Sequence, residues 1–203
     1  VGNVVGLSAQ RTIDVKRGYS IHLSIDKQMQ RQVQDVLEWA YEKYEAKSVS
    51  AVLLDPQTGE IMSMANYPTY DANTREADSS DAYGNKAIAE PYEIGSVGKV
   101  YTLATALDLG IVNPGDILLP DGHNGCEKLF EELEPICTAD KQPQPAMPIE
   151  EAFSKSDNLY FIELANRIKQ TDFYDYLRAF GLGTQTGIDI EGESFGYLIP
   201  KGR

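Results

Sequence analysis

A strongly apolar stretch, residues 96–109, constrains the fold of this chain more than any other feature. Apolar residues on nearly all sides predict a helix from Ser96 to about Leu109 that is central to the core. Gly110 follows directly and suits the C-terminal cap of that helix. Ser96 stands three residues before Lys99, so the two side chains would share one helical face and lie within reach of each other.

This spacing matters because a serine hydroxyl is a poor nucleophile until a base removes its proton. The chain has only two histidines, and neither stands in a recognisable triad, so Lys99 is the candidate base for Ser96. A Ser-x-x-Lys pair alone is weak evidence. The chain repeats the pair at Ser24 and Lys27, where it predicts only the start of a helix.

Charge and length limit the possible partners. The 203 residues carry a net charge of −13, which argues against nucleic acid and against an anionic membrane surface as partners. No segment approaches the ~20 apolar residues of a membrane helix, so an anchor of the natural protein would lie outside this chain.

The two cysteines, Cys126 and Cys137, fall in a proline-rich stretch that is typical of a loop. No metal-ligand spacing of histidine and cysteine surrounds them, so we expect no zinc site and no other metal. Two interpretations remain, a disulfide that closes a short loop or two free thiols, and the disulfide is favoured.

Periodicity and turn residues divide the chain into elements. Residues 1–18 are interpreted as a linker or the remnant of an N-terminal module, and 19–203 as the main domain. Within that domain we predict helices over 27–46, from Pro148 to about 153, over 158–168, and from a cap at Thr171 or Asp172 to Gly181. We also predict strands over 49–54, 60–65 and 187–190, and a loop over 112–147.

A second candidate motif is Ser156-Asp157-Asn158, at the junction between two predicted helices. A hydroxyl and a carboxamide two residues apart at a helix start can both point into a cleft. There one can relay a proton and the other can bind a substrate amide. Helix capping is the alternative explanation, and it would suffice if the motif stood alone.

Together the motifs resemble the penicillin-recognising serine acyltransferases, and in particular the monofunctional (class B) penicillin-binding proteins. The resemblance covers roughly residues 19–200. The matching segments are Leu23-Ser24-Ile25-Asp26-x-x-x-Gln30, Asp55-Pro56-x-Thr58-Gly59-Glu60, Tyr92-Glu93-x-Gly95-Ser96-x-x-Lys99, Ser156-x-Asn158 and Phe180-Gly181-Leu182-Gly183-x-x-Thr186-Gly187-Ile188-Asp189.

The resemblance implies an α/β fold of the α+β type, with an antiparallel sheet and a large helical subdomain. It also implies a cofactor-free D,D-transpeptidase that crosslinks peptidoglycan. Ser96 would attack a D-Ala-D-Ala stem peptide, Lys99 would be the base, Ser156 would shuttle a proton, and Asn158 would hold the substrate amide. β-Lactams would acylate Ser96 as substrate mimics.

The same resemblance implies where the protein is located in the cell and which partners it has. The protein would act on the periplasmic or extracytoplasmic face of the bacterial inner membrane, held by an N-terminal helix that is not in this chain. Its partners would be peptidoglycan stem peptides, a glycosyltransferase and other cell-wall assembly proteins.

One family motif, Lys-Thr-Gly on a strand that lines the cleft, is absent, and Lys201-Gly202 does not replace it. We therefore expect 19–203 to lack the C-terminal strands and helix of the domain, so that its sheet is incomplete. Two alternatives stay open. One is a non-catalytic scaffold or antibiotic sensor of the same fold. The other is a β-lactamase, which the 180–193 segment and the lack of a recognisable deacylating glutamate disfavour.

Overall fold

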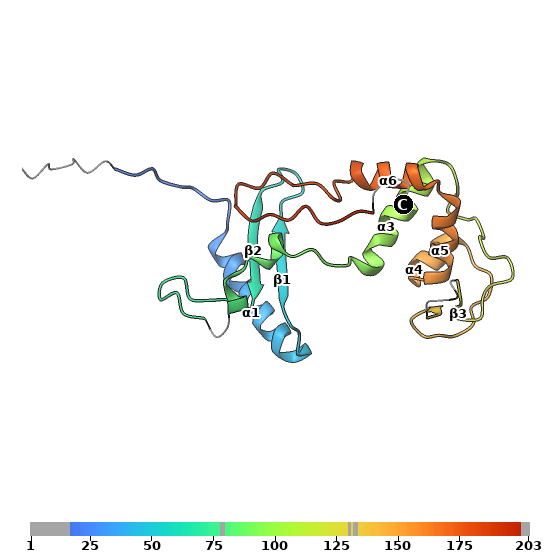
Figure 1. Cartoon of the computed structure of the whole chain (residues 1–203), viewed down its shortest axis with the longest axis horizontal. Helices are drawn as coiled ribbons and strands as arrows, with labels where there is room; N and C mark the ends of the chain where they lie inside the picture. The colour runs from blue at the N-terminus through green and yellow to red at the C-terminus, as the bar shows by residue number, and fades with distance from the viewer. Residues whose placement is uncertain (1–16, 78–79, 130, 132–133, 200–203) are drawn as a thin grey trace, which may run out of the picture. The chain divides into compact units, whose positions relative to one another are not determined.

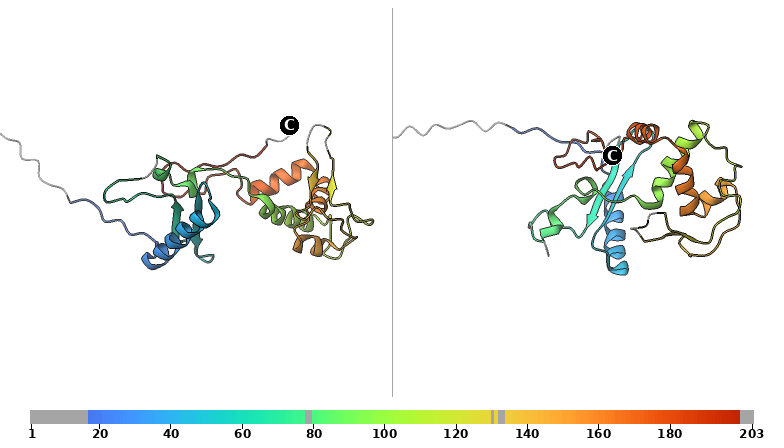
Figure 2. Two further views of the ribbon diagram at one scale, coloured as in Figure 1. Left: turned by 90° about the horizontal axis from the view of Figure 1, so that it is seen from below. Right: turned by 45° about the vertical axis from the view of Figure 1, so that its right-hand side comes forward.

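The computed structural model of the chain describes residues 17–77, 80–129, 131 and 134–199, and Figure 2 shows it from two further directions. The chain forms two compact units, one ending at Tyr83 and one beginning at Gly84. Nearly all of the predicted linker and the Lys201-Gly202 pair lie outside the described residues.

In the N-terminal unit, helix α1 (Lys27–Tyr44) packs on an antiparallel hairpin of β1 (Val49–Leu54) and β2 (Ile61–Tyr67) (Figure 1). The predicted helix and both predicted strands are confirmed. Asp26 caps the helix, because its carboxylate accepts a hydrogen bond from the backbone N–H of Met29 at 2.8 Å. A single 3₁₀ turn (Ser80–Tyr83) ends the unit.

Gln30 fixes α1 on the hairpin. Its Oε1 accepts from the hydroxyl of Ser63 at 2.8 Å and from the backbone N–H of Met64 at 3.0 Å. Its Nε2 donates to the carbonyl of Met64 at 2.9 Å. The side chain of Ser63 is fully buried, so this amide supplies its hydrogen-bond partner.

The C-terminal unit is mainly helical. Its elements are α2 (Lys86–Ala89), the 3₁₀ turn η2 (Gly95–Val97), α3 (Gly98–Asp108), β3 (Cys126–Glu127), β4 (Ile136–Cys137), α4 (Ile149–Ser154), α5 (Asn158–Arg167) and α6 (Gln170–Ala179). The core of the unit brings α3, α4 and α5 together through Ala106, Ile149, Ala152 and Leu164, each fully buried. The predicted helices are confirmed in this region, and 112–147 is a loop that contains only the short β3–β4 hairpin among its described residues.

The burial of α3 differs from the prediction. Its buried residues are Lys99, Thr102, Thr105 and Ala106, whereas Val100 and Leu107 are exposed. The prediction that this helix is central to the core was therefore wrong for one of its sides. In the described part of the chain, the most extensive contacts of α3 with other α-helices are with α5 and α6. The buried hydroxyl of Thr105 is accommodated because it donates to the carbonyl of Tyr101 at 2.7 Å.

Two boundary predictions and one strand prediction were also wrong. Pro148 is the N-cap of α4 rather than its first residue, and Lys169, not Thr171 or Asp172, is the N-cap of α6. No strand is described over 187–190. Instead, the carboxylate of Glu193 accepts from both the backbone N–H and the hydroxyl of Thr186 at 2.6 Å. This closes the segment into a loop.

The two cysteines form a disulfide, Cys126–Cys137, across the β3–β4 pair, so the favoured interpretation is confirmed. The bond closes a loop with a sequence separation of 11. Restricting an unfolded chain by a loop of this size is worth about 3 kcal/mol.

We therefore expect Cys126→Ser with Cys137→Ser to lower the free energy of unfolding by about 3 kcal/mol. Urea unfolding of the parent and the double variant, each with and without reductant, measures this. Reductant should destabilise only the parent, and thiol titration of the unfolded parent should find no free thiol. Two free thiols would contradict the disulfide.

Candidate active site

Ser96 is presented at the start of the helix that also carries Lys99. It lies in η2 and is exposed to solvent. The residue before it, Gly95, has a φ of +57°, a conformation that glycine adopts most easily. At Gly98 a Cβ would approach Cδ1 of Ile94 to 3.3 Å, so a larger residue there would require the Ile94 side chain to shift.

Lys99 is buried, and its amine lies within hydrogen-bonding distance of the other three candidate residues. Nζ lies 3.2 Å from Oγ of Ser96, 3.0 Å from Oγ of Ser156 and 2.6 Å from Oδ1 of Asn158. A fourth contact, of 2.6 Å, is with the backbone carbonyl of Ser156. All four residues singled out from the sequence therefore meet at one nitrogen atom.

A neutral amine can satisfy these contacts. Four oxygens surround Nζ, but a protonated lysine has only three N–H bonds. The two nearest oxygens, the carbonyl of Ser156 and Oδ1 of Asn158, can only accept, whereas the other two are hydroxyls that can also donate. A neutral amine can donate to both obligate acceptors and accept a proton from a serine hydroxyl with its lone pair.

Burial favours the neutral form of the amine. Loss of hydration lowers the pKa of Lys99 below its ordinary value of 10.5, and the charge of the Asp157 carboxylate opposes this shift. The face of the Phe161 ring, whose centroid is 5.7 Å from Nζ, also favours the charged form. The net direction is toward the form of lysine that can act as a base.

Ser156 lies in the short connection between α4 and α5. Its φ of +55° is unusual for a residue other than glycine. Two backbone hydrogen bonds of 2.9 Å close this turn, from Ser156 to Phe153 and from Asp157 to Ala152. The turn directs both the hydroxyl and the carbonyl of Ser156 to the amine of Lys99.

Comparison with known proteins shows the family of the chain. The family model described as "Penicillin binding protein transpeptidase domain" matches residues 49–202. The chain belongs to this transpeptidase family. Its fold is that of the family, because solved structures of penicillin-binding proteins superpose on it.

Two curated relatives and two solved structures define the similarity. The chain is 35% identical over 206 residues to penicillin-binding protein PbpB of Mycolicibacterium smegmatis, covering 98% of this chain and 30% of PbpB. It is 31% identical over 192 residues to peptidoglycan D,D-transpeptidase FtsI of Escherichia coli, covering 94% of this chain and 31% of FtsI. The chain thus spans about a third of the length of these relatives.

The first solved structure is penicillin-binding protein 3 of Mycobacterium tuberculosis in complex with aztreonam. It has a TM-score of 0.71 and 32% identity, covering 88% of this chain and 39% of that one. The second is the apo transpeptidase domain of Burkholderia pseudomallei penicillin-binding protein 3. It has a TM-score of 0.73 and 28% identity, covering 91% of this chain and 50% of that one.

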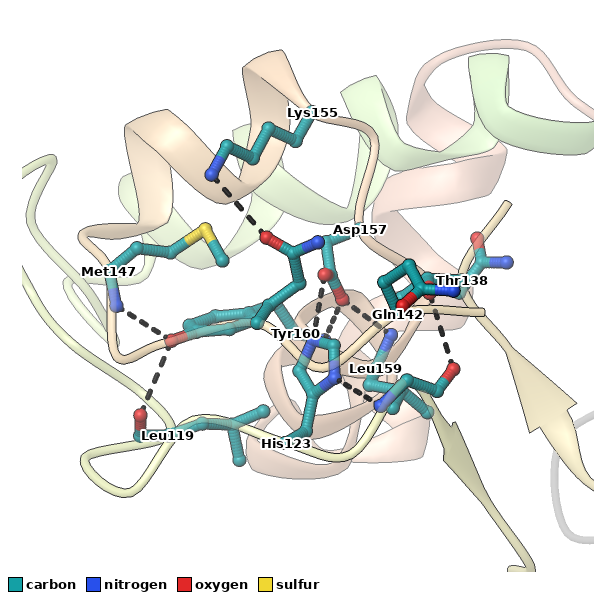
Figure 3. A network of polar contacts seen from close by, with 12 residues as sticks. Leu119, His123, Thr138, Gln142, Met147, Lys155, Asp157, Leu159 and Tyr160 are labelled. Atoms are coloured by element: carbon teal, nitrogen blue, oxygen red, sulfur yellow. Dashed lines mark hydrogen bonds and ion pairs between the residues drawn. The ribbon is translucent and has the colours of Figure 1, made fainter. Parts of the chain in front are cut away.

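Asp157, between the two motif residues of the transpeptidase domain, has a structural role. Its Oδ1 caps α5 by accepting from the backbone N–H groups of Leu159 at 2.9 Å and Tyr160 at 3.1 Å. Its Oδ2 lies 2.8 Å from Nε2 of His123 (Figure 3). Sequence reasoning missed His123, because the two partners are 34 positions apart and no known motif has that spacing.

We expect Asp157→Ala to lower the free energy of unfolding by about 2–4 kcal/mol, since it removes a helix cap and leaves a buried N–H of His123 without an acceptor. Urea unfolding measures the change. Asp172→Ala, which removes a carboxylate from the first turn of α6, is the matched control and should change it by less than about 0.5 kcal/mol. Equal losses in both variants would contradict the role of Asp157.

The described residues give no sign of a metal centre, since none of their His, Cys, Asp and Glu side chains form a group of three or more placed to hold an ion. Of the helices that the structure describes, none has the length and apolar character needed to cross a bilayer.

Proposed function

We propose that the protein containing this transpeptidase domain is a peptidoglycan D,D-transpeptidase that works by serine acyl transfer. The observation that carries the proposal is the convergence of Ser96, Ser156 and Asn158 on the amine of Lys99. An exposed hydroxyl beside a buried amine of lowered pKa is the arrangement that nucleophilic catalysis requires. The likeness to the peptidoglycan D,D-transpeptidase FtsI supports the choice of peptidoglycan as substrate.

In the acylation step, Oγ of Ser96 attacks the penultimate carbonyl of a D-Ala-D-Ala stem peptide. The amine of Lys99 takes the hydroxyl proton as the new C–O bond forms. When the C–N bond breaks, the departing D-alanine needs a proton on its nitrogen. Lys99 returns that proton through the hydroxyl of Ser156, which lies 3.0 Å away. The amine of a second stem peptide then takes the acyl group by the reverse sequence.

Two further groups would hold the substrate. The backbone N–H of Ser96 stands at the beginning of a helical segment, where N–H groups lack helical acceptors, so it can donate to the developing oxyanion. Asn158 donates one hydrogen of its Nδ2 to the carbonyl of Cys137 at 2.7 Å. Its second hydrogen remains for a carbonyl of the substrate.

β-Lactams would acylate Ser96 as analogues of the D-Ala-D-Ala end. The protein would act on the extracytoplasmic face of the membrane, held there by an anchor outside this chain and working with a glycosyltransferase and other cell-wall assembly proteins. The Cys126–Cys137 disulfide supports this location, because disulfides persist in oxidising compartments.

A labelling experiment on the full-length gene product tests the proposal. The protein is incubated with a fluorescent penicillin, and its peptides are analysed by mass spectrometry. We expect one penicilloyl adduct, on Ser96, that persists for many minutes. Rapid hydrolysis of the antibiotic would instead indicate a β-lactamase. The absence of an adduct on the folded protein would indicate a scaffold or sensor. Either result would overturn the proposal.

A further inference from the structure

The loop between α3 and α4 is tied to the first turn of α5, immediately beside the motif residues. Tyr160, fully buried, accepts from the backbone N–H of Met147 at 2.8 Å and donates to the carbonyl of Leu119 at 3.2 Å. His123 reaches Asp157 from the same loop, and Figure 3 shows these contacts side by side.

The hydrogen bonds of His123 define its protonation. The backbone N–H of Gly125 donates to Nδ1 at 3.0 Å, so Nδ1 carries no proton. Nε2 is therefore protonated and donates to Oδ2 of Asp157 at 2.8 Å. Both side chains are nearly inaccessible, with exposed fractions of 7% and 2%. The imidazole thus has one donor and one acceptor, and both are used inside the protein.

The backbone on which His123 stands is equally restrained. His123 exchanges two hydrogen bonds with Gln144, of 3.0 and 2.9 Å. The preceding Gly122 has a φ of +68°, and a Cβ there would lie 2.2 Å from the carbonyl oxygen of Gln144. No other residue allows the two segments to approach this closely. The ring of His123 therefore has a fixed position from which to hold Asp157.

The position of Asp157 controls its two neighbours in the chain. The left-handed backbone of Ser156 is an unfavourable conformation, and such conformations persist only where surrounding contacts enforce them. The carboxylate of Asp157, held by His123 and by the start of α5, fixes the residue that directly follows Ser156 in the chain. On the other side, Asn158 is oriented because its Nδ2 donates to the carbonyl of Cys137.

We propose that His123 is a positioning residue for acyl transfer: through Asp157 it holds the Ser156–Asn158 turn in the geometry that places both motif side chains against Lys99. The proposal rests on the proposed function. His123 is not the base, because its two ring nitrogens are engaged by Gly125 and Asp157.

The first test compares two substitutions in the full-length gene product. His123→Leu removes the donor to Asp157, whereas His123→Gln keeps an N–H near the position of Nε2. Stopped-flow acylation with a fluorescent penicillin separates noncovalent binding from the first-order acylation step. We expect His123→Leu to slow the acylation step about 10- to 100-fold with little change in noncovalent binding, since misplacing catalytic groups has effects of this size. His123→Gln should recover to within about threefold of the parent.

The exposed His22 supplies a matched control, because His22→Leu makes the same chemical change outside this network and should leave acylation unchanged. Folding of every variant is checked by thermal unfolding. A folded His123→Leu variant that acylates at the parent rate would overturn the proposal. So would a His123→Gln variant that acylates as slowly as His123→Leu, because the donor would then not matter.

A second pair of variants decides the question if His123→Leu does not fold. Asp157→Asn keeps the cap on α5 through its Oδ1 but turns an N–H toward Nε2 of His123. Neither neutral tautomer of His123 can then satisfy both this new amide and the backbone N–H of Gly125. Adding His123→Gln lets the glutamine carbonyl face the new N–H. We expect the double variant to acylate faster than Asp157→Asn alone, and an equal or slower rate would overturn the proposal.

Crystal structures separate this proposal from the proposed function. If the parent takes no adduct, the function fails, but the positioning role is still measured by the distance between Oγ of Ser156 and Nζ of Lys99. That distance, 3.0 Å in the parent, should exceed hydrogen-bonding range in His123→Leu and be restored in His123→Gln. An unchanged distance in His123→Leu would overturn the positioning role.

Discussion

Ser96→Ala should abolish covalent labelling by penicillin while the melting temperature stays within about 2 °C of the parent. Labelling disappears because the nucleophilic oxygen is removed. The fold is retained because the side chain is exposed and its hydroxyl, among the described residues, is hydrogen-bonded to Lys99 alone. Gel fluorescence and intact-protein mass spectrometry measure labelling, and circular dichroism measures the melting temperature.

The chain provides its own control for this prediction. Ser24 also precedes a lysine by three residues, but its hydroxyl donates to the backbone carbonyl of Ile61 at 2.7 Å. Ser24→Ala should therefore label like the parent, even if it loses about 1 kcal/mol of stability. Residual labelling in Ser96→Ala, with the adduct mapped to another residue, would show that the nucleophile is misassigned.

Lys99→Met should slow acylation by at least about 10³-fold, because a serine without its base loses most of its nucleophilic reactivity. Methionine keeps the length of the side chain and suits the buried site, so the loss can be assigned to the amine. Stopped-flow fluorescence measures the rate. Lys27→Met, in the second Ser-x-x-Lys pair, should leave it unchanged. A rate for Lys99→Met within tenfold of the parent would exclude Lys99 as the base.

The pH dependence of the parent follows from the same residue. Burial lowers the pKa of Lys99, and only the neutral amine can accept the proton of Ser96. The acylation rate should therefore rise with pH through the lowered pKa of Lys99 and level off above it. In a stable Lys99→Met variant this limb of the profile should disappear. A parent rate that falls as pH rises would contradict the assignment.

The parts of the fold with strong local signals were predictable from sequence. The hairpin was evident from two apolar runs joined by the turn residues 55–59, and α1 from its apolar periodicity. The identity of the site residues was also accessible, since Ser96 and Lys99 are neighbours on one helix and Ser156 and Asn158 lie at a helix junction.

The remaining features depend on contacts distant in sequence. The pattern of α3 predicts burial on all sides, but which side is buried depends on where α5 and α6 pack. The strand predicted over 187–190 has the right residues, yet a strand also requires a partner, and Glu193 binds Thr186 instead. His123 was missed for the same reason, because its importance comes from a carboxylate 34 residues away.

One turn of α5 holds four separate points of the preceding loop, and this has a consequence for the order of folding. Asp157, Asn158 and Tyr160 bind residues that are between 13 and 41 positions earlier in the chain. The loop can dock only after this turn exists to receive it. We therefore expect docking to come late in folding, after its transition state. Weakening these contacts should then accelerate unfolding much more than it slows folding.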